Sequence, residues 1–192
     1  MDADDYRLRL TAKYAKGDVL DIGCAPKTNP YLAGAVGVDI IPFTLPSNYI
    51  ESFVIVKENV YPRRFTGHFD TIVVGETLEH VDSPVAFLQG LVPLLTPHGQ
   101  IIITTPNPAS IQESFTHAWR YFFGHDYYFT PEKGVCHLHG FLWTHFYALA
   151  TRCNLHITTL QGISFSFGKF WFPCRFQPLS YQSLIILKRI TQ

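Results

Sequence analysis

The chain has 192 residues, which is enough for a single domain with a continuous core that needs no disulfide or metal to stabilise it. Its 15 lysines and arginines balance 15 aspartates and glutamates, so no overall positive charge favours a nucleic acid partner. No apolar run approaches the roughly 20 residues of a membrane span. The four cysteines show no C-x-x-C spacing, and the acidic N-terminus lacks the apolar centre of a secretory signal, which together predict a cytoplasmic protein with reduced thiols.

The first elements in chain order predict a nucleoside site. After an N-terminal helix or arm over residues 1–16, an apolar strand over 19–22 ends at Gly23, where a side chain would collide with a ligand lying across the strand end. We expect a helix next, then a second parallel strand that ends at Asp39. A carboxylate in that place matches the two hydroxyls of a ribose. An ordinary strand, turn and helix of an unrelated α/β protein is the alternative interpretation.

A dinucleotide site is excluded by the residues that follow Gly23. The G-x-G-x-x-G fingerprint requires glycines at positions 25 and 28, and Ala25 and Thr28 stand there.

The later elements alternate between strands and helices, which is typical of a parallel sheet covered on both faces. A helix begins after Ser83, is expected to kink at Pro93, and ends at the turn over 97–99; a second helix begins at Thr144. The remaining strands are predicted over 53–56, 69–75, 100–105, 156–160 and 183–187, the last two as a hairpin pair. The pattern predicts one Rossmann-like α/β domain over 1–192, with an open seven-stranded sheet that is mostly parallel and has a final antiparallel strand.

An aromatic cluster interrupts this pattern. Between Trp119 and Phe129, seven of eleven residues are aromatic. The rings either pack in the core under a long loop or form a lid over an apolar acceptor. Because the cluster follows the strand over 100–105, we favour the lid, and we expect residues 106–141 to form an insertion on the acceptor side.

Three segments give the chain a family resemblance. VLDIGCAP (19–26), FDTIVVGETLEHVDSP (69–84) and LLTPHGQIIITTPNP (94–108) resemble, in this order, motif I, the fourth strand and the fifth strand of the class I S-adenosylmethionine (SAM) dependent methyltransferases. Ala25 replaces the second glycine that motif I commonly has, and this departure leaves the cofactor affinity open. The resemblance implies that SAM is the cofactor. It also implies a cofactor site in which Asp39 holds the ribose, Glu58 or Asn59 approaches the adenine, and Asp21, Gly23 and Ala25 line the methionine end. Gly75 is also predicted to bind the cofactor.

The acceptor side is predicted to contain acids and histidines. Glu76, Glu79 and His80 follow one strand end in the arrangement E-x-x-E-H, and His137 and His139 precede a helix. The arrangement resembles ubiquinone-pathway O-methyltransferases and, including H-x-H, small-RNA 2′-O-methyltransferases. In the RNA family the matching positions, Glu76, Glu79, His80 and His139, bind a metal, here Mg²⁺ or Mn²⁺. The alternative is that L-E-H is structural, as in relatives without metal, and that Thr144 simply caps a helix.

These observations predict a SAM-dependent methyltransferase that O-methylates a small apolar or ring-bearing hydroxyl acceptor. His137, His139 and Glu76 are the predicted catalytic groups, since an acceptor hydroxyl needs a base. Two alternatives stay open, a metal-dependent enzyme that methylates an RNA 2′-hydroxyl and a protein that binds SAM without turning it over. The neutral charge disfavours RNA, because phosphate neutralisation normally dominates its affinity. The oligomeric state is not predicted.

Overall fold

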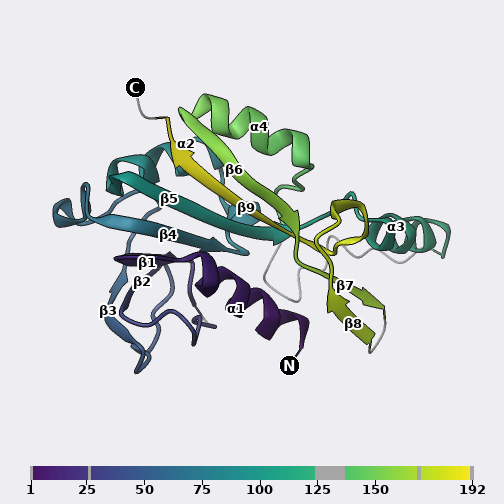
Figure 1. Ribbon diagram of the computed structural model, residues 1–192, viewed down its shortest axis with the longest axis horizontal. Coiled ribbons are helices and arrows are strands. Elements are labelled where there is room, and N and C mark those ends of the chain that lie inside the picture. The colour runs from purple at the N-terminus through teal and green to yellow at the C-terminus, as the bar shows by residue number, and fades with distance from the viewer. Residues whose placement is uncertain (1, 26, 124–136, 168–169, 191–192) are drawn as a thin grey trace.

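The fold is a single seven-stranded sheet with the order β3-β2-β1-β4-β5-β9-β6 (Figure 1). The computed structural model describes residues 2–25, 27–123, 137–167 and 170–190. Only β9 runs antiparallel to its neighbours β5 and β6, so the predicted fold class is confirmed. The strands of this sheet are β1 (Val19–Ile22), β2 (Ala35–Asp39), β3 (Tyr49–Val54), β4 (Phe69–Gly75), β5 (Leu95–Pro106), β6 (Leu155–Gly162) and β9 (Gln182–Arg189).

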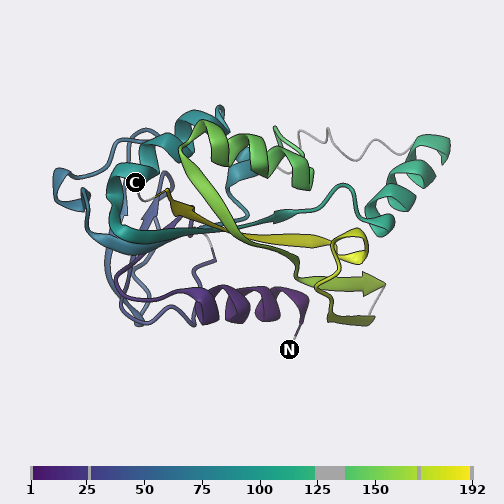
Figure 2. The same cartoon turned by 45° about the horizontal axis from the view of Figure 1, so that its top comes forward.

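Helices cover both faces of the sheet (Figure 2). On one face α1 (Ala3–Tyr14) packs Leu10 against Ile102 of β5. On the other, α2 (Pro84–Leu91) and α4 (Trp143–Arg152) pack against Ile101 and Ile103 of the same strand. Because successive residues of a strand point to opposite faces, the continuous apolar run of β5 fills both layers of the core.

Helix α3 (Ile111–Phe123) and the small hairpin β7 (Ser164–Phe167) and β8 (Phe170–Pro173) lie beyond one end of the sheet (Figure 1). The hairpin was not predicted, because its aromatic run carries no clear alternation. Short 3₁₀ turns complete the fold at η1 (Arg63–Phe65), η2 (Leu78–His80), η3 (Val92–Leu94) and η5 (Gln177–Leu179). The second half of the aromatic cluster, from Tyr127 to Phe129, lies outside the described residues.

The helix predicted after Gly23 is wrong. Among the described residues between β1 and β2, the chain forms bends and turns only. Pro30 disfavours a helical backbone at Asn29, whose side chain instead accepts a hydrogen bond from the amide of Tyr31 at 3.0 Å. The Asn29 amide group also donates to the carbonyl of Leu8 at 3.0 Å, which joins this loop to α1.

Several predicted boundaries move. Strand β3 lies earlier than the predicted 53–56 because it pairs with β2 from Tyr49 to Val54, and Val56 beyond its end is 95% exposed. Helix α2 ends at Leu91, before Pro93, and the predicted turn over 97–99 lies inside β5, where the register with β4 shifts between Phe69 and Thr71. Helix α4 begins at Trp143, one residue before Thr144. The final hairpin pair is confirmed as β6 and β9.

None of the described helices is long and apolar enough to span a membrane.

Candidate active site

The site lies at the edge where β1, β2, β4 and β5 reach their carboxyl ends. At the end of β1, Gly23 adopts a left-handed φ of +70°, and its amide donates to the carbonyl of Val38 at 2.8 Å. A Cβ at this position would lie 2.2 Å from Oγ1 of Thr77. Glycine is therefore required here by both the backbone conformation and the side chain that crosses it.

Asp39 at the end of β2 is buried and fastens this loop. Its Oδ2 accepts from the amide of Ala25 at 2.7 Å, and its Oδ1 accepts from the amide of Ile41 at 2.9 Å. Each carboxylate oxygen retains a second lone pair, so the same side chain is able to accept from a ligand hydroxyl. Ala25 thus belongs to the loop through its backbone, where an alanine methyl does not disturb the contact.

A cavity of about 40 Å³ lies beside Asp21, Gly23 and Gly75, three of the residues predicted to bind the cofactor. Asp21 accepts a hydrogen bond from the Tyr49 hydroxyl, and its burial raises the pKa of its carboxyl to about 6. The cavity also contains two cationic residues, Arg7 and Lys27, that the sequence analysis missed.

Arg7 and Lys27 share the carboxylate of Asp4. Nη2 of Arg7 lies 2.9 Å from Oδ1 of Asp4, and Nζ of Lys27 contacts Oδ2. Arg7 is buried and also donates to Oγ1 of Thr104 at 3.3 Å, so α1 delivers a positive charge to the ends of β4 and β5. The sequence carried only a weak signal for this role, namely two arginines, Arg7 and Arg9, shortly after the three acids of the N-terminus.

Glu76 follows β4 directly and joins three strand ends. Its backbone has a φ of +51°, its amide donates to the carbonyl of Thr104 at 2.8 Å, and its Oε2 accepts from Nε2 of Gln182 at 3.1 Å. Its other oxygen, Oε1, is buried and finds no partner among the described residues. Burial raises the pKa of this carboxyl above its ordinary value.

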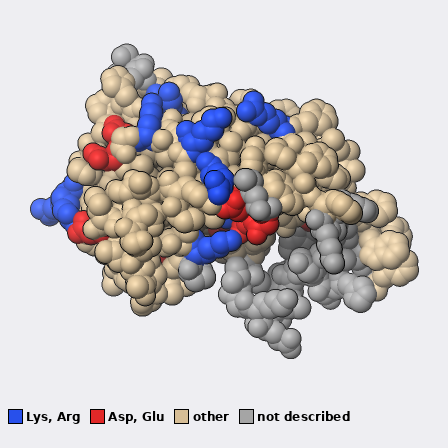
Figure 3. All heavy atoms as spheres, turned by 60° about the horizontal axis from the view of Figure 1, so that its bottom comes forward, with Lys and Arg blue, Asp and Glu red and all other residues tan. Residues whose placement is uncertain are grey.

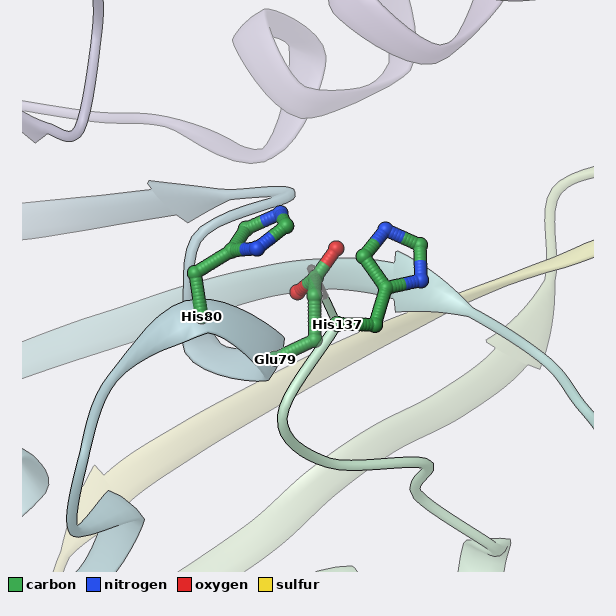
Figure 4. A group of neighbouring side chains, drawn as sticks. All are labelled: Glu79, His80 and His137. Atoms are coloured by element: carbon green, nitrogen blue, oxygen red, sulfur yellow. The ribbon is translucent and has the colours of Figure 1, made fainter. Parts of the chain in front are cut away.

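Glu79, His80 and His137 form a compact group, with one potential ligand atom from each lying within 4.8 Å of the others. Figure 4 shows the three side chains turned toward one another from η2 and from the segment before α4. That segment is fixed because the amides of Leu138 and His139 donate to the carbonyl of Glu79 at 2.8 and 3.1 Å. The rings of His80 and His137 lie 4.8 Å apart between centroids.

Glu79 is 1% exposed and only partly satisfied. Its Oε2 accepts from Oγ1 of Thr105 at 3.1 Å, while its Oε1 is buried with no partner in the described part of the chain. Burial, with the nearby charge of Glu76, raises the pKa of Glu79 to about 8. Partial desolvation and the neighbouring His80 lower the pKa of His137, which keeps that ring neutral near pH 7.

The group differs from the predicted metal set in two members. His137 takes the place of His139, whose Nε2 donates to the carbonyl of Val81 at 2.9 Å instead. Glu76 lies nearby but is not part of the group. A regularly extended segment would place His137 and His139 on the same side. The backbone departs from that pattern where the amides of Leu138 and His139 both donate to the carbonyl of Glu79, and the two rings have different partners.

The residues predicted for adenine lie between β3 and α2. Asn59 has a φ of +63°, and its Nδ2 donates to the carbonyl of Ala86 at 3.1 Å. Its Oδ1 is buried without a partner among the described residues. Glu58 is half-buried. Its pKa is raised mainly by this burial and also by the negative charge of Asp82. Their contact with adenine stays a prediction.

The comparison with protein families decides the assignment. Residues 2–139 match the family described as the methyltransferase domain. The chain is a class I SAM-dependent methyltransferase. A search of curated proteins finds no match to this methyltransferase.

Solved structures agree with the methyltransferase fold. A SAM-dependent methyltransferase from Methanosarcina mazei is 18% identical with a TM-score of 0.65, covering 95% of this chain and 98% of that one. Magnesium protoporphyrin IX methyltransferase from Synechocystis, solved with S-adenosylhomocysteine (SAH), is 11% identical with a TM-score of 0.65, covering 98% and 84%. The small RNA methyltransferase HEN1 is 15% identical with a TM-score of 0.60, covering 98% of this methyltransferase and 25% of that chain.

Proposed function

We propose that this methyltransferase O-methylates a hydroxyl group on a small apolar or ring-bearing molecule. The observation that carries the proposal is the convergence of Glu79, His80 and His137 at the carboxyl edge of the sheet. A neutral amine is already a nucleophile, whereas a hydroxyl of high pKa needs a base or a cation to become one. The cluster provides both options, and the exposed rings of Phe115 and Trp119 on α3 support an apolar acceptor.

The residues that hold the cofactor are proposed from the cavity beside β1. SAM, when bound, supplies an electrophilic methyl group. Arg7 and Lys27 suit its carboxylate and Asp21 suits its ammonium group, because the charges are opposite. Asp39, at the end of β2, suits the ribose because its carboxylate accepts hydrogen bonds from hydroxyl groups.

With no ion in the group, the proton of the acceptor hydroxyl is assigned to His137. A divalent ion would take the lone pair of His137 and would activate the hydroxyl in its place. At neutral pH the ring of His137 is uncharged and accepts a proton, while Glu79, with a pKa of about 8, is largely protonated unless a cation lies against it. Glu79 therefore donates a hydrogen bond in the absence of a cation and becomes a ligand in its presence.

Replacing Asp39 by alanine is expected to weaken SAH binding by about 1–3 kcal/mol, since a charge-assisted hydrogen bond to the ribose is lost. Calorimetric titration measures the change. Asp39→Asn is the matched control, because its amide oxygen still accepts one of the two backbone bonds from Ala25 and Ile41. Unchanged SAH affinity in a folded alanine variant contradicts the ribose role.

We also propose that Glu79, His80 and His137 hold a divalent ion that activates the hydroxyl. One carboxylate and two imidazoles suit Mn²⁺ better than Mg²⁺, which prefers oxygen ligands. The unpartnered Oε1 of Glu79 supports this fit. Calorimetry is expected to show Mn²⁺ binding that His137→Gln removes and that His139→Gln retains, because His139 lies outside the group. Equal loss in both variants rules out this ligand set.

The acceptor class is tested with labelled SAM and matched pairs of small aromatic compounds that differ only in bearing a hydroxyl or an amine. We expect label in the hydroxyl members. Label confined to amines contradicts O-methylation, and no transfer despite tight SAH binding contradicts turnover itself. The cytoplasmic location is retained as part of the proposal, supported by the free thiols of Cys24, Cys153 and Cys174.

An RNA 2′-hydroxyl is the second candidate acceptor, favoured by the same acid–histidine cluster and by the fold shared with HEN1. The distribution of surface charge disfavours RNA binding. Figure 3 shows scattered lysines and arginines on the α1 face, some beside acidic residues, without a broad basic patch. Lys27 and Arg9 are paired there with Asp4 and Asp5. Methyl transfer to a short RNA that falls steeply with salt is the result that favours RNA.

A further inference from the structure

A second cavity, of about 470 Å³, lies beside the segment before α4, and none of Glu79, His80 and His137 lines it. Its walls are the start of α2 (residues 82–85), the segment 138–141 and one face of α4. His139 lines this cavity, whereas His137 faces the acid–histidine group. The volume is in the range of small-molecule sites, which is about 300–1,000 Å³.

The hydrogen bonds around the cavity define its donors. The amide of Leu142 donates to Nδ1 of His145 at 3.2 Å, so the hydrogen of the neutral ring lies on Nε2. Arg152, two turns further along the same face of α4, has no ion-pair partner among the described residues. Both groups therefore offer N–H donors, and one of them carries a permanent positive charge.

The acceptors lie on the opposite wall. The carbonyl of Val81 can only accept, so Nε2 of His139 carries the hydrogen and Nδ1 of the neutral ring is an acceptor. Asp82 adds a carboxylate, and no hydrogen bond or ion pair engages it within the described part of the chain. Between these walls the surface is apolar, formed by Val85, Leu138 and Leu149 among others.

We infer that this cavity binds a small organic acid with an apolar or aromatic body and a hydroxyl or amino group. The acid pairs with Arg152 and His145, the body covers the apolar wall, and the hydroxyl or amino group donates to Asp82 or His139. The site is separate from that proposed for the methyl acceptor, because the residues that line the cavity and the acid–histidine group have no member in common. The inference does not rest on the proposed O-methylation.

The test is a titration of the whole protein with 3-(4-hydroxyphenyl)propionate, followed through backbone amide shifts. Saturable shifts at Val85, Ala148 and Leu149 are expected at millimolar probe. We expect Arg152→Gln to weaken binding about tenfold, as for the loss of one charge-assisted contact. Ala148→Trp should abolish binding, because Ala148 is an exposed helix position that lines the cavity.

Three controls decide the location and the chemistry. The probe 4-propylphenol lacks the carboxylate, so the wild type should bind it more weakly than it binds the acid. Arg152→Gln should bind 4-propylphenol with the same affinity as the wild type. Glu79→Gln should bind the acid like the wild type, since the two sites are separate, and Ala148→Trp should bind SAH like the wild type, which shows that it is folded. No saturable shift at millimolar acid, or binding that survives Ala148→Trp, overturns the inference.

Discussion

Replacing Glu79 by glutamine is expected to lower methyl transfer by about a hundred- to ten-thousandfold, the usual range for loss of a group that moves or polarises a proton. Glutamine keeps the size of the side chain and the acceptor for Thr105, but it neither ionises nor binds a divalent ion strongly. SAH affinity should stay within about twofold of the wild type, because Glu79 belongs to the acceptor side. Initial rates with labelled SAM measure the effect, and near-wild-type turnover contradicts the assignment.

The same variant is expected to change the pH dependence of stability. The folded pKa of Glu79, about 8, lies above its ordinary value of 4.5, so its contribution to stability is fully present below pH 4.5 and is lost as the pH rises through about 8. Glutamine has no such ionisation. Relative to the wild type, Glu79→Gln should gain on the order of a few kcal/mol between about pH 5 and about pH 9. Denaturant unfolding across this range measures the difference, and parallel profiles refute a raised pKa.

Replacing Gly23 by alanine is expected to destabilise the fold by about 3 kcal/mol or more and to remove SAH binding. The left-handed φ of +70° costs a residue with a Cβ roughly 1–2 kcal/mol, and the new methyl meets Thr77 at a distance that forces a shift. Denaturant unfolding and calorimetry measure the two effects.

Gly67→Ala is the matched control for this steric argument. Gly67 has a similar φ of +65°, but nothing lies within 4 Å of the added Cβ, so only the backbone cost of about 1–2 kcal/mol is expected. Adding Thr77→Ala to the Gly23 variant should recover part of its stability, because it removes both side-chain atoms that lie closest to the new methyl. Equal destabilisation at both glycines contradicts the contact with Thr77.

Much of the sheet was predictable because its strands are long apolar runs with clear ends. Most residues of β4 and β9 are buried, and β6 pairs with β9 as predicted although the hairpin of β7 and β8 lies between them in the chain. The errors occur where tertiary contacts override local preference. The loop after Gly23 contains no helix because Asn29 bonds to α1, and β3 begins at Tyr49 because its neighbour β2 sets the register there.

The sequence by itself predicted the family, the strand that ends at Gly23, and the positions of Gly23, Asp39, Glu79 and His80 at or just after strand ends, since these depend on local spacing and on the common carboxyl edge of parallel strands. The tertiary structure alone decided that Arg7 of α1 lies beside Gly75 and that His137, not His139, faces Glu79. Both results depend on packing between segments far apart in the chain. Which of His137 and His139 faces Glu79 depends on the backbone hydrogen bonds from Leu138 and His139 to Glu79. The spacing of residues in the sequence does not predict these bonds.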